Sequence, residues 1–338
     1  MLVTSYPHMK FKSKNLLVTG GAGFIGSNFI DYFLNKYDDS NVINLDLLTY
    51  AGNLNNLKNI ENNLRYKFVH GDICDKKLVE NILLENKIDG IINFAAETHV
   101  DNSIINPDIF VKTNINGVFN LLNCAYNYWM EKPFKVKKDF ELSRFHQIST
   151  DEVYGSIDKG SFTEENKYTP NSPYSASKAS ADMIVRSFNK TFGMNTTISI
   201  SSNNFGPNQN KEKFIPKIIE CIKTNKFIPV YGNGKNIRDW IYVEDHCRLI
   251  DIIFNQSVEG KTYNIGGENE LTNLKLIETI HNIINKNKGK KYDKGINFIK
   301  DRYGHDKRYS LNIDKIKKDF NWKTNSNFFD SLEKTIYK

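Results

Sequence analysis

The segment NLLVTGGAGFIG, residues 15–26, is the strongest indication of the fold. Its first five residues form a short, mostly apolar run typical of a buried strand, and a helical pattern extends from residue 24 to about residue 35. Between them the glycines fit both G-x-G-x-x-G, at Gly21, Gly23 and Gly26, and G-x-x-G-x-x-G, starting at Gly20. Because the absent side chains let the backbone approach a pyrophosphate at a helix N-terminus, the segment predicts a dinucleotide-binding turn.

A carboxylate in the expected place supports that prediction. Asp46 ends the next strand-like run, residues 42–46, and lies 20 residues after Gly26. An acid at this distance accepts hydrogen bonds from the adenosine ribose and disfavours a 2′-phosphate, so the sequence predicts NAD rather than NADP. Asp72, which follows the run at residues 66–70, either contacts the adenine edge or caps the following helix.

Strand-like and helix-like segments alternate along the first two thirds of the chain. This alternation predicts an α/β fold of the Rossmann type, a doubly wound parallel sheet with ligands beyond the carboxyl ends of its strands. After residue 201 turn signals become frequent, which predicts a smaller C-terminal substrate-binding domain. We expect residues 14–200 to form the NAD-binding domain with the catalytic residues, and residues 201–338 mainly the smaller domain, with interleaved segments. The strands are expected at residues 15–19, 42–46, 66–70, 90–94, 145–149 and 196–201.

Composition excludes several other classes of protein. The 338 residues carry a net charge of +7, but Lys and Arg are spread along the chain, so no nucleic-acid partner is predicted. The four cysteines form no Cys-x-x-Cys pair, which argues against a metal site or disulfides and for a reducing compartment. No apolar run is long enough for a membrane span, and residues 1–14 lack the apolar centre of a signal peptide. We therefore expect a cytoplasmic protein without a membrane partner.

Tyr174 and Lys178 lie four residues apart in Ser-Pro-Tyr-Ser-Ala-Ser-Lys. Ser172 and Pro173 are typical of a helix start, so the two side chains share one helical face. A nearby ammonium, together with a bound nicotinamide cation, can lower the pKa of a phenol from its usual value near 10, which makes the tyrosine a base for an alcohol proton. The same spacing also arises by chance on many helices.

An acid pair directly follows the strand expected at residues 145–149. Asp151 and Glu152 stand in Ser-Thr-Asp-Glu-Val-Tyr-Gly, just beyond Thr150. Adjacent acids in a loop are usually solvated. At the carboxyl end of a strand, beside a nicotinamide site, they can instead act as an acid and a base if their surroundings separate their pKa values.

Together these motifs resemble the extended short-chain dehydrogenase/reductases and, within them, the dTDP-glucose 4,6-dehydratases. The resemblance rests on Thr-Gly-Gly-Ala-Gly-Phe-Ile-Gly, Ala-Ala-Glu-Thr-His-Val-Asp, Ser-Thr-Asp-Glu-Val-Tyr-Gly and Tyr-x-x-x-Lys. It continues through Ser-Asn-Asn-Phe-Gly-Pro-Asn-Gln, Arg-Asp-Trp-Ile-Tyr-Val-Glu-Asp-His and Tyr-Gly-His-Asp-Lys-Arg-Tyr, and so covers residues 15–322. The acid pair is its most specific part, because related epimerases lack it.

The resemblance implies removal of water from a nucleoside-diphosphate-glucose to give the 4-keto-6-deoxy sugar. Tyr174 deprotonates the sugar 4-hydroxyl while hydride passes from C4 to NAD, Lys178 keeps the tyrosine anionic and binds the nicotinamide ribose, and Thr150 hydrogen-bonds O4. Glu152 then removes the C5 proton, and protonated Asp151 gives its proton to the leaving 6-hydroxyl. Hydride returns to C6. The resemblance also implies a homodimer.

It further implies ligand contacts by matching position, with no metal. Arg238 and Lys213 suit phosphate oxygens, although Arg238 can equally form a structural salt bridge with Asp239. The expected NAD contacts are Gly20, Gly23, Phe24, Ile25, Gly26, Asp46, Leu47, Thr49, Asp72, Ile73, Ala95, Ala96, Thr98, Thr113, Tyr174, Lys178 and Asn204. The expected contacts with the nucleotide sugar are Thr98, Thr150, Asn203, Lys213, Phe214, Pro229, Tyr231, Arg238, Asn273, Arg302 and His305.

Two positions depart from the bacterial dTDP-glucose pattern. Asn102 stands where those proteins usually have Arg, and the wording His-Val-Asp-Asn-Ser is similar to that of plant enzymes acting on UDP-glucose. Tyr303 replaces a usual Pro. The base, thymine or uracil, therefore stays open. A nucleotide-sugar 4-epimerase is the nearest alternative reading, but it has no use for the acid pair. An NAD-bound interaction protein without catalysis leaves the four reactive side chains without a joint purpose.

Overall fold

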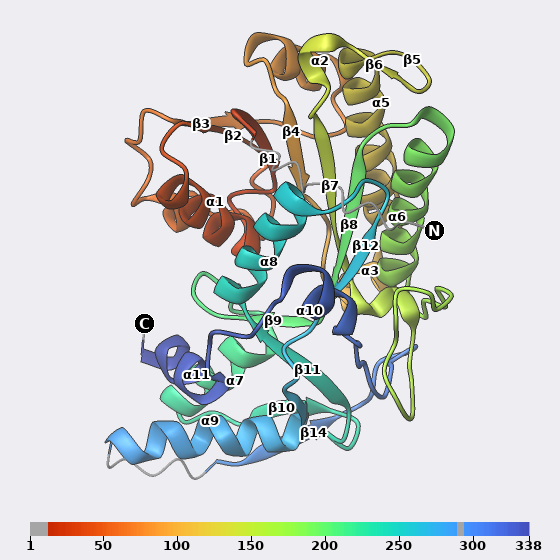
Figure 1. Cartoon of the computed structure of the whole chain (residues 1–338). Coiled ribbons are helices and arrows are strands. Elements are labelled where there is room, and N and C mark those ends of the chain that lie inside the picture. Colours follow the sequence, from red (N-terminus) through yellow and green to blue (C-terminus); the bar gives the residue numbers. More distant parts are fainter. Residues whose placement is uncertain (1–12, 289–293, 338) are drawn as a thin grey trace.

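A parallel sheet forms the centre of the larger lobe. The computed structural model describes residues 13–288 and 294–337. Residues 1–12, where the sequence predicts no signal peptide, lie outside the described residues. So do residues 289–293 and 338 of the expected smaller domain. The sheet has seven parallel strands in the order β3-β2-β1-β4-β7-β8-β12 within this part of the chain (Figure 1). This confirms the predicted Rossmann-type fold. The strands are β1 (Asn15–Thr19), β2 (Asn41–Asp46), β3 (Tyr66–His70), β4 (Gly90–Asn93), β7 (Arg144–Thr150), β8 (Thr196–Ser201) and β12 (Thr262–Ile265).

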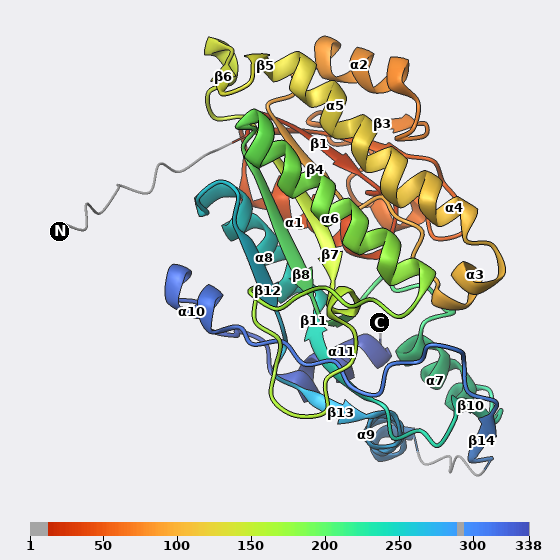
Figure 2. The same ribbon diagram turned by 90° about the vertical axis from the view of Figure 1, so that its right-hand side faces the viewer.

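Helices cover both faces of this sheet, as Figures 1 and 2 show. Leu17 of β1 packs in the cluster on one face, whereas its neighbours Leu16 and Val18 pack in the cluster on the other, because successive strand side chains point to opposite sides. One face carries α1 (Phe24–Lys36) and α8 (Val243–Gln256), and the other carries α2 (Lys76–Glu85), α5 (Val118–Trp129) and α6 (Pro173–Phe192). Shorter helices lead into α5, namely α3 (Val100–Ile105), α4 (Asp108–Phe110) and a π-helical segment (Val111–Gly117), and the hairpin β5 (Met130–Lys132) and β6 (Lys135–Val136) follows it.

The second lobe has a core of its own, built around Phe205, Trp240 and Leu276. Its strands form a three-stranded sheet in the order β13-β11-β9 and a parallel pair of β10 and β14. These strands are β9 (Asn203–Phe205), β10 (Ile228–Tyr231), β11 (Ile237–Tyr242), β13 (Glu270–Thr272) and β14 (Ile296–Ile299), and the helices are α7 (Phe214–Lys223), α9 (Asn273–Lys288) and α11 (Phe328–Tyr337). The helix α10 (Asp314–Phe320) instead contacts β12 of the large sheet.

The chain crosses between the lobes more than once after residue 201. Both α8 and β12 follow β9 in sequence, yet they complete the large sheet and its cover, while β10 and β11 lie in the second lobe (Figure 1). The carboxyl ends of β7 and β8 therefore open toward the smaller lobe. The described residues contain no helix long and apolar enough to cross a membrane, and the four cysteines are free thiols.

Candidate active site

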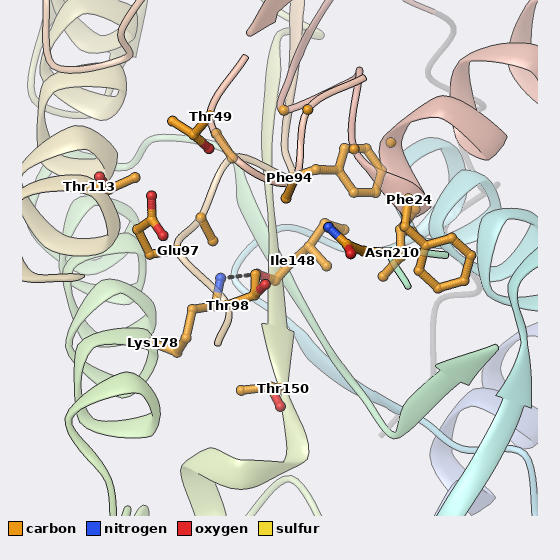
Figure 3. Close-up of a pocket in the computed structure, with 18 of the residues that line it drawn as sticks. Phe24, Thr49, Phe94, Glu97, Thr98, Thr113, Ile148, Thr150, Lys178 and Asn210 are labelled. Atoms are coloured by element: carbon orange, nitrogen blue, oxygen red, sulfur yellow. Dashed lines mark hydrogen bonds between the residues drawn. The ribbon is translucent and has the colours of Figure 1, made fainter. Parts of the chain in front are cut away.

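One continuous cavity lies beyond the carboxyl ends of the large sheet. It extends from the glycine turn after β1 to the acid pair after β7, and it is bordered on the far side by the loop around Lys213. Figure 3 shows that the labelled side chains of Thr98, Thr150 and Lys178 come from three different segments and gather around it. A single cavity thus contains both the predicted dinucleotide turn and the predicted proton-transfer groups.

The glycine turn packs too closely to its neighbours for side chains. Gly20 has a φ of +68°, and a Cβ there would lie 2.6 Å from the amide nitrogen of Ala95. A Cβ on Gly26 would lie 2.5 Å from the carbonyl oxygen of Gly20, where α1 crosses the turn. Gly23 is the N-cap of α1, so the free amides of the first helical turn face the cavity. This cradle fits the pyrophosphate of a dinucleotide.

Asp46 fixes the turn and leaves capacity for a ribose. Its carboxylate accepts hydrogen bonds from the amides of Ala22, at 2.9 Å, and Leu48, at 2.8 Å. Each oxygen keeps a further acceptor site, and the residue lines the cavity. Asp72 also lines the cavity, whereas the following helix α2 is capped by Asp75, so the alternative of Asp72 as a helix cap is wrong. The residues present fit NAD.

Tyr174 and Lys178 lie on the first two turns of α6. Ser172 caps this helix in a reciprocal capping box with Ser175, and Pro173 occupies the first turn, as the sequence predicts. Both reactive side chains are buried and line the cavity. The Lys178 ammonium donates to the carbonyl oxygen of Ile148 at 2.6 Å, the hydrogen bond drawn in Figure 3. The lysine is therefore held against the end of β7.

The protein groups alone keep the Tyr174 phenol protonated. Burial raises the pKa of Tyr174 well above 10, and the nearby Glu152 carboxylate raises it further, while the Thr150 hydroxyl acts in the opposite direction. Burial also lowers the pKa of Lys178 to about 8. The lowered phenol pKa that the sequence predicts thus depends on the positive charge of a bound nicotinamide as well as on Lys178.

Asp151 and Glu152 lie in different surroundings, as a pair that acts as an acid and a base requires. Asp151 is 3% exposed, one of its oxygens has no hydrogen-bond partner, and burial together with Glu152 raises its pKa well above the usual range. Burial also raises the pKa of Glu152, but Arg238, Lys213 and Arg302 all act to lower it. Asp151 is buried, Glu152 is half-buried and both line the cavity, so the interpretation of the pair as a solvated loop is wrong. Asp151 is the better proton donor and Glu152 the better base.

Polar contacts join three loops over the cavity. The Tyr50 hydroxyl lies 3.2 Å from the Thr98 hydroxyl, and Lys213 donates to the Thr98 carbonyl oxygen at 3.2 Å. Asn210 donates to the Tyr50 carbonyl oxygen at 3.4 Å. Because these residues follow β2, β4 and β9, the contacts connect the second lobe to the loops of the first across the cavity.

The structure places the expected site residues in two groups. Every expected NAD contact lines the cavity, and so do four of the expected substrate contacts, Thr98, Thr150, Asn203 and Lys213. The other seven belong to the second lobe and do not line this cavity: Phe214, Pro229, Tyr231, Arg238, Asn273, Arg302 and His305.

The cationic side chains of the second group are positioned by specific contacts. The Arg302 guanidinium stacks on the Tyr231 ring at 4.4 Å and pairs with Asp101 at 3.2 Å. Arg238 stacks on the Tyr309 ring at 4.2 Å and donates to main-chain carbonyls. Asp239 instead accepts amides of residues 267 and 269, so the suggested Arg238–Asp239 salt bridge is wrong. The exposed Tyr303, one of the two departures, does not line the cavity.

Several residues of the site were missed from the sequence. Glu97 is a buried acid that lines the cavity, and Figure 3 shows its carboxylate between Thr113 and the Lys178 side chain. It stands in the Ala-Ala-Glu-Thr-His-Val-Asp motif, so a signal existed. Tyr50 and Asn210 had none, because they join the site through loop contacts between distant segments, Tyr50 with Thr98 and Asn210 with Tyr50.

Comparisons with known proteins agree with this geometry. A family model described as GDP-mannose 4,6 dehydratase matches residues 17–335. The chain belongs to this family. A dTDP-glucose 4,6-dehydratase of Escherichia coli is 46% identical, over 95% of this chain and 92% of the relative. The crystal structure of DesIV, a dTDP-glucose 4,6-dehydratase from Streptomyces venezuelae with NAD and TYD bound, is 41% identical, with a TM-score of 0.87 over 96% of each chain.

The comparisons also bear on the choice between a 4,6-dehydratase and a 4-epimerase. The UDP-glucose 4-epimerase of Thermotoga maritima has the same fold, with a TM-score of 0.83 over 96% of this chain and 97% of the other, but its identity is 26%. The resemblance to the extended dehydrogenases and their 4,6-dehydratases is confirmed, and the epimerase is the more distant relative of this member of the GDP-mannose 4,6-dehydratase family.

Proposed function

We propose that this chain is an NAD-dependent 4,6-dehydratase of a nucleoside-diphosphate-glucose, with dTDP-glucose as its preferred substrate. The observation that carries the proposal is the convergence of Tyr174, Lys178 and the acid pair Asp151 and Glu152 on one cavity with the dinucleotide turn. Similarity to dTDP-glucose 4,6-dehydratases over 95% of the chain supports both the reaction and the thymine base.

In the first half of the reaction the chain removes a proton from the sugar 4-hydroxyl. Tyr174 takes this proton, and Thr150, on the adjacent end of β7, holds O4. Lys178 stabilises the phenolate and contacts the nicotinamide ribose. Bound NAD supplies a hydride acceptor for C4, a store of that hydride for C6 and a positive ring charge that lowers the Tyr174 pKa.

In the second half the acid pair removes water. The C4 ketone acidifies the proton on C5, and Glu152 takes it. Asp151, whose high pKa keeps it protonated, gives its proton to the departing 6-hydroxyl, which leaves as water. The resulting C5–C6 double bond accepts hydride at C6 and a proton at C5, and the latter returns from Glu152. Tyr174 then gives up the proton it gained and Asp151 regains the one it lost, both by exchange with solvent, so the products are water and the 4-keto-6-deoxy sugar nucleotide.

The remaining polar residues are proposed to bind the nucleoside diphosphate. Lys213 and Asn203 lie at the cavity, and Arg238 and Arg302 lie near enough to act on Glu152 electrostatically. Their fixed cations suit the diphosphate oxygens. Phe214, Pro229, Tyr231, Asn273 and His305 are proposed to complete the nucleotide site.

Parallel incubations with dTDP-glucose and UDP-glucose test the reaction and the base together. We expect the alkali-induced absorbance of a 4-keto-6-deoxy product with both, and a kcat/KM higher by about tenfold or more for dTDP-glucose, since one well-placed contact is worth about 1–2 kcal/mol. A higher kcat/KM for UDP-glucose would overturn the thymine assignment. Formation of a galactose nucleotide without loss of water would replace the dehydratase by an epimerase.

We also propose that the chain forms a homodimer through the face of α5 and α6. The two helices lie side by side on one surface of the large lobe (Figure 2). Exposed apolar side chains occur on them and on the segments that lead to them, with Phe119 on α5, Met183 on α6, and Ile105 and Val111 just before α5. A surface of this kind is typical of a protein–protein interface.

Phe119→Glu combined with Met183→Glu is expected to weaken this dimer, because two carboxylates would be desolvated at the interface. We expect the dimer Kd to rise by about tenfold or more, measured by sedimentation equilibrium. Leu64→Glu, at a fully exposed leucine before β3, is the matched control and is expected to leave the Kd unchanged. If the dimer Kd of the double variant equals that of the natural chain, the interface lies elsewhere.

A further inference from the structure

A third ionisable residue continues the line of Tyr174 and Lys178 along α6. Asp182 lies four residues after Lys178 and eight after Tyr174, so all three occupy one face of the helix. This face packs against β7. Asp182 is 1% exposed and does not line the cavity, so it contacts neither the cofactor nor the sugar.

Two hydroxyl groups hold the Asp182 carboxyl group in place. The Ser149 hydroxyl donates to its Oδ2 at 2.5 Å, and the Tyr168 hydroxyl donates to the same oxygen at 3.3 Å. Its Oδ1 is buried and has no hydrogen-bond partner among residues 13–288 and 294–337. A buried carboxylate with an unpartnered oxygen is costly unless a positive charge lies near, and Lys178 is the cation that acts on it.

Among the described residues, Asp182 is the acidic group whose charge acts on Lys178. The Lys178 ammonium donates to the neutral carbonyl of Ile148, and Asp182 is the group that opposes the effect of burial on it. The titratable groups packed around these two residues come from α6, the loop after β4, the segment after β7 and the loop before α6. They are Tyr174, Glu97, Asp151, Glu152, Tyr154 and Tyr168.

We propose that Asp182 is a positioning residue for the proposed oxidation at C4: held by Ser149 and Tyr168, it is the buried counter-charge that keeps the Lys178 ammonium protonated beneath Tyr174. This inference rests on the proposed function for its catalytic consequence, but not for the electrostatic pairing itself.

The directions of the pKa shifts agree with this pairing. Burial lowers the pKa of Lys178 to about 8, and Asp182 raises it against that effect. Burial raises the pKa of Asp182 to about 7, and Lys178 lowers it. The charged form of Lys178 is therefore lost as the pH rises through its pKa. Removal of the carboxylate charge moves that loss to lower pH.

Asp182→Asn tests the proposal because it removes the charge and keeps an acceptor for Ser149. In the NAD-loaded protein with lysines labelled with ¹³C at Cε, we expect the Lys178 titration to move down by about one pH unit or more. The alkaline limb of the kcat profile moves with it, so that kcat at pH 8 falls by about fivefold or more while KM is unchanged. A role in packing alone would lower kcat equally at every pH.

Tyr168→Phe is the matched control, because it removes one hydrogen bond to Asp182 and leaves the charge. We expect its Lys178 titration to stay near that of the natural chain. If Asp182→Asn does not fold, Lys178→Met provides the reciprocal measurement, in which the carboxyl ¹³C titration of Asp182 moves to higher pH. Unchanged titrations in these variants overturn the pairing, whether or not the protein is a dehydratase. A shifted titration without any dehydratase activity overturns the proposed function alone.

Discussion

Tyr174→Phe is expected to lower kcat by about a thousandfold, the usual contribution of a positioned general base. The phenylalanine keeps the ring against Phe110, with which Tyr174 makes an edge contact at 6.3 Å, but it has no oxygen to accept the proton of the 4-hydroxyl. Without that transfer C4 is not oxidised. Stopped-flow measurement of reduced nicotinamide absorbance therefore shows no rise on mixing with substrate, although the substrate still binds.

Tyr263→Phe is the matched control for this variant. Tyr263 is also buried, and its hydroxyl donates to Asp319 at 3.1 Å, away from the cavity. We expect the control to retain kcat within a few-fold, since it loses a buried hydrogen bond worth about 1 kcal/mol of stability and no catalytic group. Turnover by Tyr174→Phe close to that of the natural chain would refute the assignment of Tyr174 as the base.

Glu152→Gln is expected to separate the two halves of the reaction. Tyr174 and Lys178 are untouched, so C4 is still oxidised and reduced nicotinamide accumulates. The amide cannot take the C5 proton, so kcat falls by about a hundredfold or more. In deuterium oxide, recovered sugar nucleotides show no solvent deuterium at C5 by mass spectrometry.

Asp151→Asn is the informative partner of that variant. It leaves Glu152 as the base but removes the proton donor for the 6-hydroxyl. We expect C5 to exchange with solvent without loss of water. Normal C5 exchange in Glu152→Gln, or its absence in Asp151→Asn, would show that the roles of the two acids are assigned the wrong way round.

Local sequence signals predicted most of the fold, and the family resemblance implied most of the cavity lining. The bounds expected for β1, β3 and β8 are those of the structure, and Ser172 caps α6 as predicted. Such features depend on apolar runs, turn residues and caps within a few positions of each other. The expected NAD contacts line the cavity because parallel strands end at the same edge, which brings residues that follow each strand together.

Features that depend on distant contacts could not be predicted in this way. β12 is a four-residue strand, and only its pairing with β8 places it in the large sheet. The contact of Tyr50 with Thr98 and that of Asp101 with Arg302 join segments separated by 48 and 201 residues. The burial of Asp182 requires the packing of α6 on β7, and no pattern within α6 identifies the Ser149 hydroxyl as its partner.

The proposed reaction requires one cavity in which the hydrogen removed from C4 is kept and returned to C6 of the same sugar. Its most direct test uses dTDP-glucose carrying deuterium at C4, with product analysed by NMR in ordinary water. We predict that the deuterium appears at C6 of the 4-keto-6-deoxy product and that C5 carries ordinary hydrogen. Deuterium retained at C4, or lost to solvent or to free reduced nicotinamide, would contradict the account.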